Sequence, residues 1–210
     1  MSKARFISVE GIEGVGKSTH LAFIRDYLVS RGRDVLMTRE PGGTPAAEKI
    51  RALLLEPGAE ALSREAELLM MFAARALHVE NVIRPALKAG HWVVCDRFVD
   101  ASYAYQGGGR GIPAARIASL ERWVLRGLKP DLTLLLDAPV AVGLTRMTQR
   151  GARDRFEREQ TAFFNRVRRT YLARARREPR RVRVIAAHDG LSQVQTRIRE
   201  QLDARLRRWL

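Results

Sequence analysis

The chain has 210 residues, 46% of them hydrophobic, and a formal net charge of +15. This length fits one domain (residues 1–210) with its own core, and the composition excludes a disordered chain. No run of about twenty apolar residues exists, which excludes a membrane span, and we expect no membrane partner. The N-terminus, MSKARFISVE, lacks the apolar segment of a signal peptide, so we expect a cytoplasmic protein.

Most of the positive charge lies in the last third of the chain. Residues 141–210 contain 19 arginines and 7 acidic residues, a balance of +12. A surface that binds nucleic acid would explain such an excess. Arginines such as Arg168, however, are interspersed with apolar Phe164 and Val167 at helical spacing, which predicts a buried stripe and a solvated basic face. We therefore expect no nucleic-acid partner; the alternative role of the charge is to attract polyphosphate substrates.

Strand and helix patterns alternate from the N-terminus onward. Short apolar runs predict strands at residues 5–10, 34–38, 92–96, 132–137 and 182–186. Between them, amphipathic spacing predicts helices over about 18–31 and 63–88, and others that begin near 113 and 161. Such alternation implies parallel pairing and right-handed crossovers. We therefore predict a three-layer α/β/α protein with a five-stranded parallel sheet.

The first strand leads into a glycine-rich loop. Residues 11–18, GIEGVGKS, match G-x-x-x-x-G-K-[ST] directly after a strand and before a helix, which is the P-loop pattern. Its backbone N–H groups and the helix N-terminus bind phosphate oxygens. Lys17 supplies a charge near the β- and γ-phosphates, and Ser18 offers a hydroxyl to Mg²⁺. The predicted ATP site comprises Gly11, Ile12, Glu13, Gly14, Val15, Gly16, Lys17, Ser18 and Thr19.

Three further side chains come at or near strand ends. Asp96 follows the apolar run 92–95, so its carboxylate should emerge at the sheet edge where ligands bind and could order the Mg²⁺ shell. A helix cap is the alternative role for Asp96. Asp137 ends its strand in the same way, but no motif supports it, and we expect a structural role. Cys95 is the only cysteine and is expected to be a buried thiol.

The remaining motifs indicate the phosphoryl acceptor. They are TREPGGT (38–44), FAAR (72–75), DRF (96–98) and YQGGGRG (105–111). Together with the P-loop, their order and spacing resemble those of bacterial thymidylate kinases, from the first strand to the helix that begins near Thr161. The resemblance implies transfer of the γ-phosphoryl of ATP, with Mg²⁺, to dTMP. The products would be dTDP and ADP, in a step of dTTP biosynthesis, and the enzyme would be a homodimer with residues 63–88 as a plausible contact.

The resemblance also implies roles for individual residues. Arg39 and Arg97 would clamp the dTMP phosphate, because guanidinium groups form paired, charge-assisted hydrogen bonds with phosphate. Glu13 would accept a hydrogen bond from the sugar 3′-hydroxyl. Tyr105 would crowd the 2′ carbon and exclude ribonucleotides. The residues implied at the base are Arg75 on a thymine carbonyl, Ser102 on the Watson–Crick edge, and Gln106 beside it.

One position departs from the family pattern. An aromatic residue that stacks on thymine usually precedes the arginine by four residues, whereas here that position is Met71 and Phe72 is three before Arg75. Both spacings share a helix face, so Phe72 is predicted to stack on the base. Met71 in that place, with Phe72 in the core, is the alternative.

A basic segment at residues 150–158 resembles the mobile lid that closes over ATP. Arg150 and Arg155 fit the family pattern R-G-x-x-D-R-x-E, and Arg153 is an extra arginine. Gly14 stands where some members have a P-loop arginine, so the lid arginines would stabilise the transferring phosphoryl group. The predicted catalytic residues are therefore Glu13, Lys17, Arg97, Arg150 and Arg155.

Two other functions stay open on the sequence. A kinase for a different nucleoside or nucleoside monophosphate would share the fold and the chemistry. A basic P-loop ATPase or switch that binds nucleic acid or protein would share only the donor loop, and the sequence contains no base-stacking platform or recognition helix that favours it.

Overall fold

The computed structural model describes residues 4–56, 61–148 and 154–209, and its strands form one parallel sheet. The strand order is β2-β3-β1-β4-β5. The strand bounds are Phe6–Glu10 (β1), Val35–Arg39 (β2), Trp92–Asp96 (β3), Leu132–Asp137 (β4) and Val182–Ala186 (β5). The predicted five-stranded parallel sheet is confirmed, and no strand end is displaced by more than one residue.

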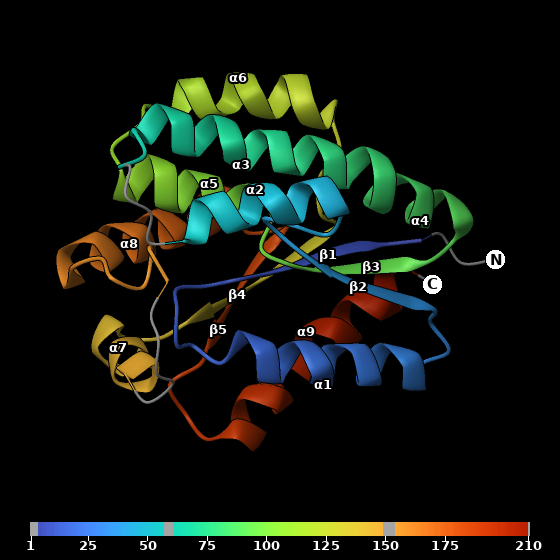
Figure 1. Ribbon diagram of the computed structural model, residues 1–210. Helices are drawn as coiled ribbons and strands as arrows, with labels where there is room; N and C mark the ends of the chain where they lie inside the picture. Colours follow the sequence, from blue (N-terminus) through green and yellow to red (C-terminus); the bar gives the residue numbers. More distant parts are fainter. Residues whose placement is uncertain (1–3, 57–60, 149–153, 210) are drawn as a thin grey trace.

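Helices cover both faces of the sheet (Figure 1). Helices α1 and α9 lie on one face, and α3, α4, α5 and α6 lie on the other. The bounds are Lys17–Ser30 (α1), Pro45–Leu55 (α2), Arg64–His78 (α3), Arg84–Ala89 (α4), Val99–Ser102 (α5), Ala114–Leu125 (α6), Val140–Thr148 (α7), Thr161–Arg177 (α8) and Leu191–Trp209 (α9). The three-layer prediction is therefore also confirmed.

The core is divided by the sheet, because successive side chains of a strand point to opposite faces. In β3, Trp92 and Val94 pack into a cluster with α1, α8 and α9, while Val93 and Cys95 pack into a second cluster with α3 and α6. The Cys95 thiol is fully buried, as predicted, and burial raises its pKa well above the ordinary value. This two-sided burial explains why the central strands are continuous apolar runs.

In the part of the chain that the structure describes, two π-helical segments interrupt the α-helices. The predicted helix 63–88 is helical throughout, but Val79–Ile83 (η1) forms a π-turn between α3 and α4. A second segment, Tyr103–Gly109 (η2), continues α5 and packs against α8. Its glycines permit close packing, since a Cβ on Gly108 would lie 2.1 Å from Thr170 Oγ1. The glycine-rich motif 105–111 thus brings two helices together beside the sheet edge.

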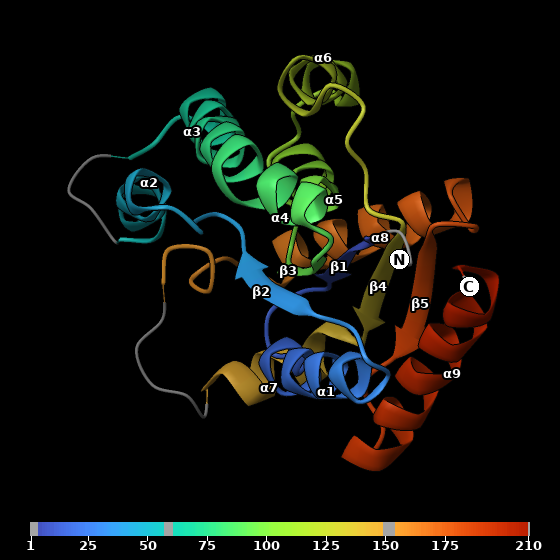
Figure 2. The same ribbon diagram turned by 90° about the vertical axis from the view of Figure 1, so that its right-hand side faces the viewer.

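The two ends of the described chain meet on one side of the molecule (Figure 2). The guanidinium of Arg5 lies 4.9 Å from the ring centroid of Trp209, and the Trp209 ring packs on Trp92 at 5.5 Å. Among the helices described, none combines the length and hydropathy needed to cross a bilayer.

Candidate functional site

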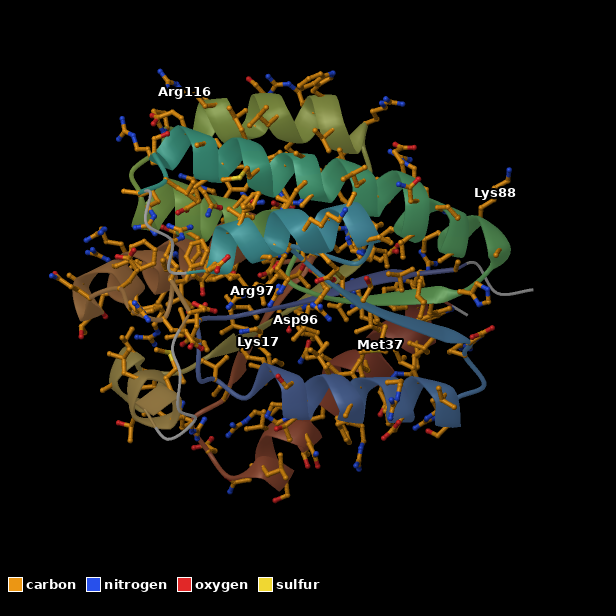
Figure 3. All side chains as sticks on the ribbon, in the orientation of Figure 1. Lys17, Met37, Lys88, Asp96, Arg97 and Arg116 are labelled. Atoms are coloured by element: carbon orange, nitrogen blue, oxygen red, sulfur yellow. The ribbon has the colours of Figure 1, made fainter. Side chains whose placement is uncertain are left out.

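A cavity opens at the carboxyl ends of β1, β2 and β3, the edge at which open parallel sheets bind ligands. Figure 3 shows Lys17, Asp96 and Arg97 near one another beside the N-terminal end of α1. The cavity collects most of the predicted site residues, although they come from separate segments of the chain. Its lining includes Glu13, Gly14, Gly16, Lys17, Ser18, Pro41, Arg51, Met71, Arg75, Asp96, Arg97, Ser102, Tyr105 and Gln106.

The P-loop forms the floor on the α1 side. Gly16 has φ 89°, a left-handed conformation that glycine adopts without strain, and α1 starts at the next residue. Lys17 Nζ donates to the carbonyls of Gly11 (3.3 Å) and Ile12 (3.2 Å). Burial, followed by the charge of Arg97, lowers the Lys17 pKa to about 8.

The other P-loop positions differ in what they offer a ligand. The side chains of Ile12 and Val15 belong to the core, so only their backbone can meet a phosphate. Ser18 and Thr19 are exposed at the first turn of α1, and only Ser18 lines the cavity. The loop therefore presents backbone groups, one ammonium and one hydroxyl to the cavity.

Arg97 crosses the cavity between β3 and the P-loop. Its backbone has φ 68°, which is uncommon for a residue with a side chain. One terminal nitrogen donates to Gly11 O (2.9 Å) and Tyr171 Oη (3.3 Å), and the other to Glu13 Oε1 (2.8 Å). The guanidinium also stacks on Tyr105 at 4.8 Å. A strained backbone and four contacts thus fix one cation over the loop.

Glu13 and Tyr105 face each other across the same space. The Tyr105 hydroxyl donates to the Glu13 carboxylate, with distances of 2.7 Å and 2.6 Å to its two oxygens. The Tyr105 ring is 5% exposed and packs edge-on against Phe156 and Phe163. The predicted catalytic carboxylate and the predicted sugar-side aromatic therefore form one unit with Arg97.

The deep end of the cavity carries neutral and cationic donors. Arg75 is 2% exposed and donates to Ser102 Oγ at 2.9 Å and to the carbonyl of Phe98 at 3.3 Å. The amide nitrogen of Gln106 donates to the buried carboxylate of Glu67 at 2.8 Å. Arg75, Ser102 and Gln106, which the family resemblance assigns together to the base, all line this cavity.

The prediction that Phe72 stacks on the base is not supported by its position. Phe72 is 2% exposed, packs in the cluster between α3 and the sheet, and is not among the residues that line the cavity. Its ring lies 4.6 Å from the Arg75 guanidinium, so it supports that side chain from behind. Met71, the alternative, is the one that lines the cavity. Adjacent residues of an α-helix point about 100° apart, so Met71 can face the cavity while Phe72 faces the core.

Arg39 and Arg51 are two further cations on this side of the sheet, and of the two only Arg51 is among the residues that line the cavity. Arg39 ends β2, is about half exposed, and pairs with Glu48 at 2.9 Å. Arg51 on α2 lines the cavity and donates to the carbonyl of Pro41 at 2.9 Å, and burial, together with Arg39, lowers its pKa. The sequence analysis missed Arg51; its only signal is a place on the helix after the 38–44 motif.

A divalent cation would fit between α1 and β3. Asp96 Oδ1 is buried and has no hydrogen-bond partner within the described residues. Because buried polar atoms normally have a partner, this oxygen is a candidate metal ligand. Ser18 lines the same cavity. Within those residues no three His, Cys, Asp or Glu side chains gather to hold a metal alone. The donor set therefore suits Mg²⁺ that completes its shell with phosphate and water.

Arg155 points away from the P-loop. Its Nε donates to Leu54 O at 2.8 Å and its backbone N–H to Leu55 O at 3.0 Å, both at the end of α2. A terminal nitrogen lies 2.7 Å from Glu67 Oε2. Its neighbour Phe156 lines the cavity, whereas Arg155 does not. Arg150 and Arg153, the other predicted lid arginines, lie outside the described residues.

A buried acid beneath the site was also missed. Glu10, the last residue of β1, is fully buried and accepts from the Phe98 backbone N–H and the Tyr171 hydroxyl, each at 2.7 Å. Burial, followed by the nearby charge of Asp100, raises its pKa to about 8. Glu10 therefore connects the P-loop strand to the turn that carries Arg97. In the sequence it reads as the ordinary end of a strand.

Asp137 has a structural role, as expected. It accepts two hydrogen bonds from Arg168 of α8, at 2.7 and 2.8 Å, and it does not line the cavity.

Comparisons with known proteins agree with this geometry. Residues 9–198 match the family model for thymidylate kinase. The thymidylate kinase of Chromohalobacter salexigens is 59% identical over all of both chains. That of Chromobacterium violaceum is 54% identical over 98% of this chain and 97% of its own. The crystal structure of thymidylate kinase from Ehrlichia chaffeensis superposes with a TM-score of 0.77 at 33% identity, over 95% of this chain and 98% of that one.

Proposed function

Because the chain belongs to the thymidylate kinase family, we propose that its cavity holds dTMP opposite ATP and transfers the γ-phosphoryl group to it. The enzyme is an ATP-dependent nucleoside monophosphate kinase that forms dTDP for dTTP synthesis. The observation that carries the proposal is the convergence, in one cavity, of the P-loop with the acceptor residues Arg75, Ser102 and Tyr105.

The acceptor would lie with its phosphate toward Arg97 and its base toward Arg75. Arg97 and Arg51, which line the cavity, and the more exposed Arg39 outside its lining would supply the cations that a phosphate monoester needs. Glu13 is within reach of a sugar hydroxyl, and the Tyr105 ring restricts the space beside it. Gln106 and Ser102 offer polar groups to the base edge.

The donor would occupy residues 11–19. Backbone N–H groups of the loop and the Lys17 ammonium would bind the phosphates, and Ser18 and Asp96 would hold Mg²⁺. Bound Mg²⁺ would neutralise charge on the β- and γ-phosphate oxygens. Phosphoryl transfer needs alignment and charge neutralisation more than covalent catalysis, and Lys17 and Arg97, which both line the cavity, would provide them.

The catalytic role of the lid arginines stays a proposal. Arg150 fits the position of a transition-state cation in the family pattern. The contacts of Arg155 with Glu67 and with the end of α2 support an anchoring task for it instead.

A panel of acceptors tests the function. Purified protein with ATP-Mg²⁺ should turn over dTMP faster than dUMP, UMP, CMP, AMP or thymidine, measured by ADP release and by chromatography of the product. A faster turnover of any other acceptor would reject the assignment. ATP hydrolysis stimulated by DNA or RNA without an acceptor would point to the P-loop switch instead.

A homodimer and a cytoplasmic location are part of the same proposal. Leu69 on α3 is 57% exposed and Trp123 on α6 is 76% exposed, on two helices that lie side by side (Figures 1 and 2). Apolar side chains of this kind support a contact between two copies through these helices. Light scattering of the purified enzyme measures the oligomeric state, and a monomeric mass would contradict it.

A further inference from the structure

A chain of buried hydrogen bonds leads away from the deep end of the cavity. Glu40 Oε2 accepts from Arg75 Nε at 2.7 Å, and Glu40 Oε1 lies 3.1 Å from His78 Nδ1. His78 Nε2 lies 2.6 Å from Thr38 Oγ1. Glu40 is 5% exposed and His78 is fully buried. Glu40 itself lines the cavity beside Arg75, whereas His78 does not, and no role in binding the donor or the acceptor was assigned to either residue above.

The chemistry of each group fixes the direction of this chain. A carboxylate only accepts, so Glu40 receives one hydrogen bond from Arg75 and one from the Nδ1–H of His78. In the neutral ring Nε2 then accepts from the Thr38 hydroxyl. Gly43 makes room for the ring, since a Cβ there would lie 2.5 Å from His78 Cδ2. His78 thus orients the Glu40 carboxylate through Oε1, and Glu40 in turn orients Arg75 through Oε2.

Arg75 is consequently fixed in its plane and in its rotation. Three of its five N–H donors are used, one each by Glu40, Ser102 and the carbonyl of Phe98. The rings of Phe72 and Phe98 lie 4.6 and 5.6 Å from the guanidinium carbon. Among the described residues, one N–H on each terminal nitrogen has no acceptor and could serve a ligand, and Arg75 lines the cavity.

We propose that Glu40, held by His78, is a positioning residue that sets base selectivity by aiming the free N–H donors of Arg75 at a base carbonyl. The inference rests on the proposed function. A guanidinium cannot accept a hydrogen bond, so a fixed guanidinium favours a pyrimidine with a carbonyl at that edge and disfavours one with an amino group. Without the Glu40 carboxylate, the buried Nε loses its charged acceptor, and the guanidinium is held less firmly, by Ser102, the Phe98 carbonyl and the two rings alone.

The test compares three acceptors in two variants. In Glu40→Gln, kcat/KM should fall about 10- to 100-fold for dTMP and dUMP, mostly through KM, because a hydrogen bond between charged groups is removed. The fall for dCMP, which has an amino group at that edge, should be several-fold smaller. Glu80→Gln, on the exposed side of η1, is the matched control and should leave all three values unchanged.

Two further measurements separate positioning from a general loss of structure. The double variant Glu40→Gln/Arg75→Ala should be no slower with dTMP than Arg75→Ala alone, since Glu40 acts through Arg75. If Glu40→Gln does not fold, His78→Asn, whose amide nitrogen can still reach Glu40, should show the same substrate order with a smaller effect. Equal losses on all three acceptors, or additive losses in the double variant, would overturn the inference. A wild-type enzyme that prefers another acceptor would instead refute the proposed function.

Discussion

Several side chains that face the cavity are held by partners outside its lining. Gln106 is held by Glu67, and Arg97 by Tyr171. Such preorganisation lowers the entropy that binding must overcome, because the rotamers of the site are already fixed. At the residue scale, the positions that face the nucleotide and the positions that support them can therefore be separated by mutation.

Met71 and Phe72 provide the simplest case. Met71→Ala should raise the KM for dTMP several-fold with little change in the free energy of unfolding, because a cavity wall is lost. Phe72→Ala should instead destabilise the fold by about 3–5 kcal/mol, because a buried aromatic is removed from the core. Steady-state kinetics and urea unfolding measure the two effects. A raised KM in Phe72→Ala, with a loss of stability in Met71→Ala, would show that Phe72 contacts the base.

The sequence predicted residues that belong to local motifs and missed those defined by distant partners. Lys17, Arg97 and Tyr105 stand in patterns whose spacing carries chemistry. Glu10 becomes significant only when the turn at Phe98 and the α8 residue Tyr171 fold onto it. A sequence cannot show a contact between residues 161 positions apart.

At the scale of elements, the segment 154–159 is docked through Glu67. That carboxylate is 1% exposed and pairs with both Arg110 and Arg155, two residues that follow α3 at widely separated positions in the sequence. Phe156 packs on Arg155 at 4.4 Å and on Tyr105 at 5.9 Å. Through Phe156, this segment packs against Tyr105, the residue assigned to the sugar of the acceptor.

If Arg155 anchors segment 154–159 through Glu67, substitutions of Arg155 and of Glu67 should have the same effect on kcat. Arg155→Met and Glu67→Gln should each lower kcat, and the double variant should be no worse than the stronger single variant. Arg150→Met should cost far more, up to about 10³-fold in kcat, as expected for a transition-state arginine. If Arg155→Met lowered kcat by about 10³-fold while Glu67→Gln left kcat unchanged, Arg155 would be a catalytic residue and not an anchor.

The contact between η2 and α8 gives a second prediction at this scale. Gly108→Ala should destabilise the fold by about 1–3 kcal/mol, because its Cβ would lie 2.1 Å from Thr170 Oγ1. Gly190→Ala is the control, since the nearest atom to its Cβ would be Gln193 Oε1 at 3.9 Å. Denaturant unfolding compares the two, and equal stabilities would show that η2 has room to shift.

Strands and helices were predictable because burial on two faces leaves continuous apolar runs, and burial on one face leaves a helical stripe. The π-turn at Val79–Ile83 was not predictable, since a single added residue per turn leaves no periodic signal. Segment 150–158 was assigned to the lid from its motif alone, and only the direction of Arg155 indicates which of its arginines is an anchor.

For the whole molecule, Glu10 makes stability depend on pH. Its pKa of about 8 in the fold exceeds the ordinary value of 4.5, so between these pH values the unfolded chain loses a proton that the folded chain keeps. The Glu10 contribution to the free energy of unfolding should therefore fall, by on the order of a few kcal/mol, as pH rises from about 4.5 to 8. Glu10→Gln should remove that slope, and urea titrations from pH 5 to 9 measure it. Parallel slopes would contradict the assignment.

The contact of Arg5 with Trp209 has a consequence for chain connectivity. Because the ends of the described chain touch, a short linker could join them without stretching the sheet. The chain could then be opened at the exposed turn of Arg126 and Gly127, where both residues have positive φ and α6 has already ended. A circularly permuted enzyme of this kind would keep the P-loop, β3 and η2 in their present order along one continuous segment. Opening the chain at this turn would therefore leave the order of these site segments unchanged.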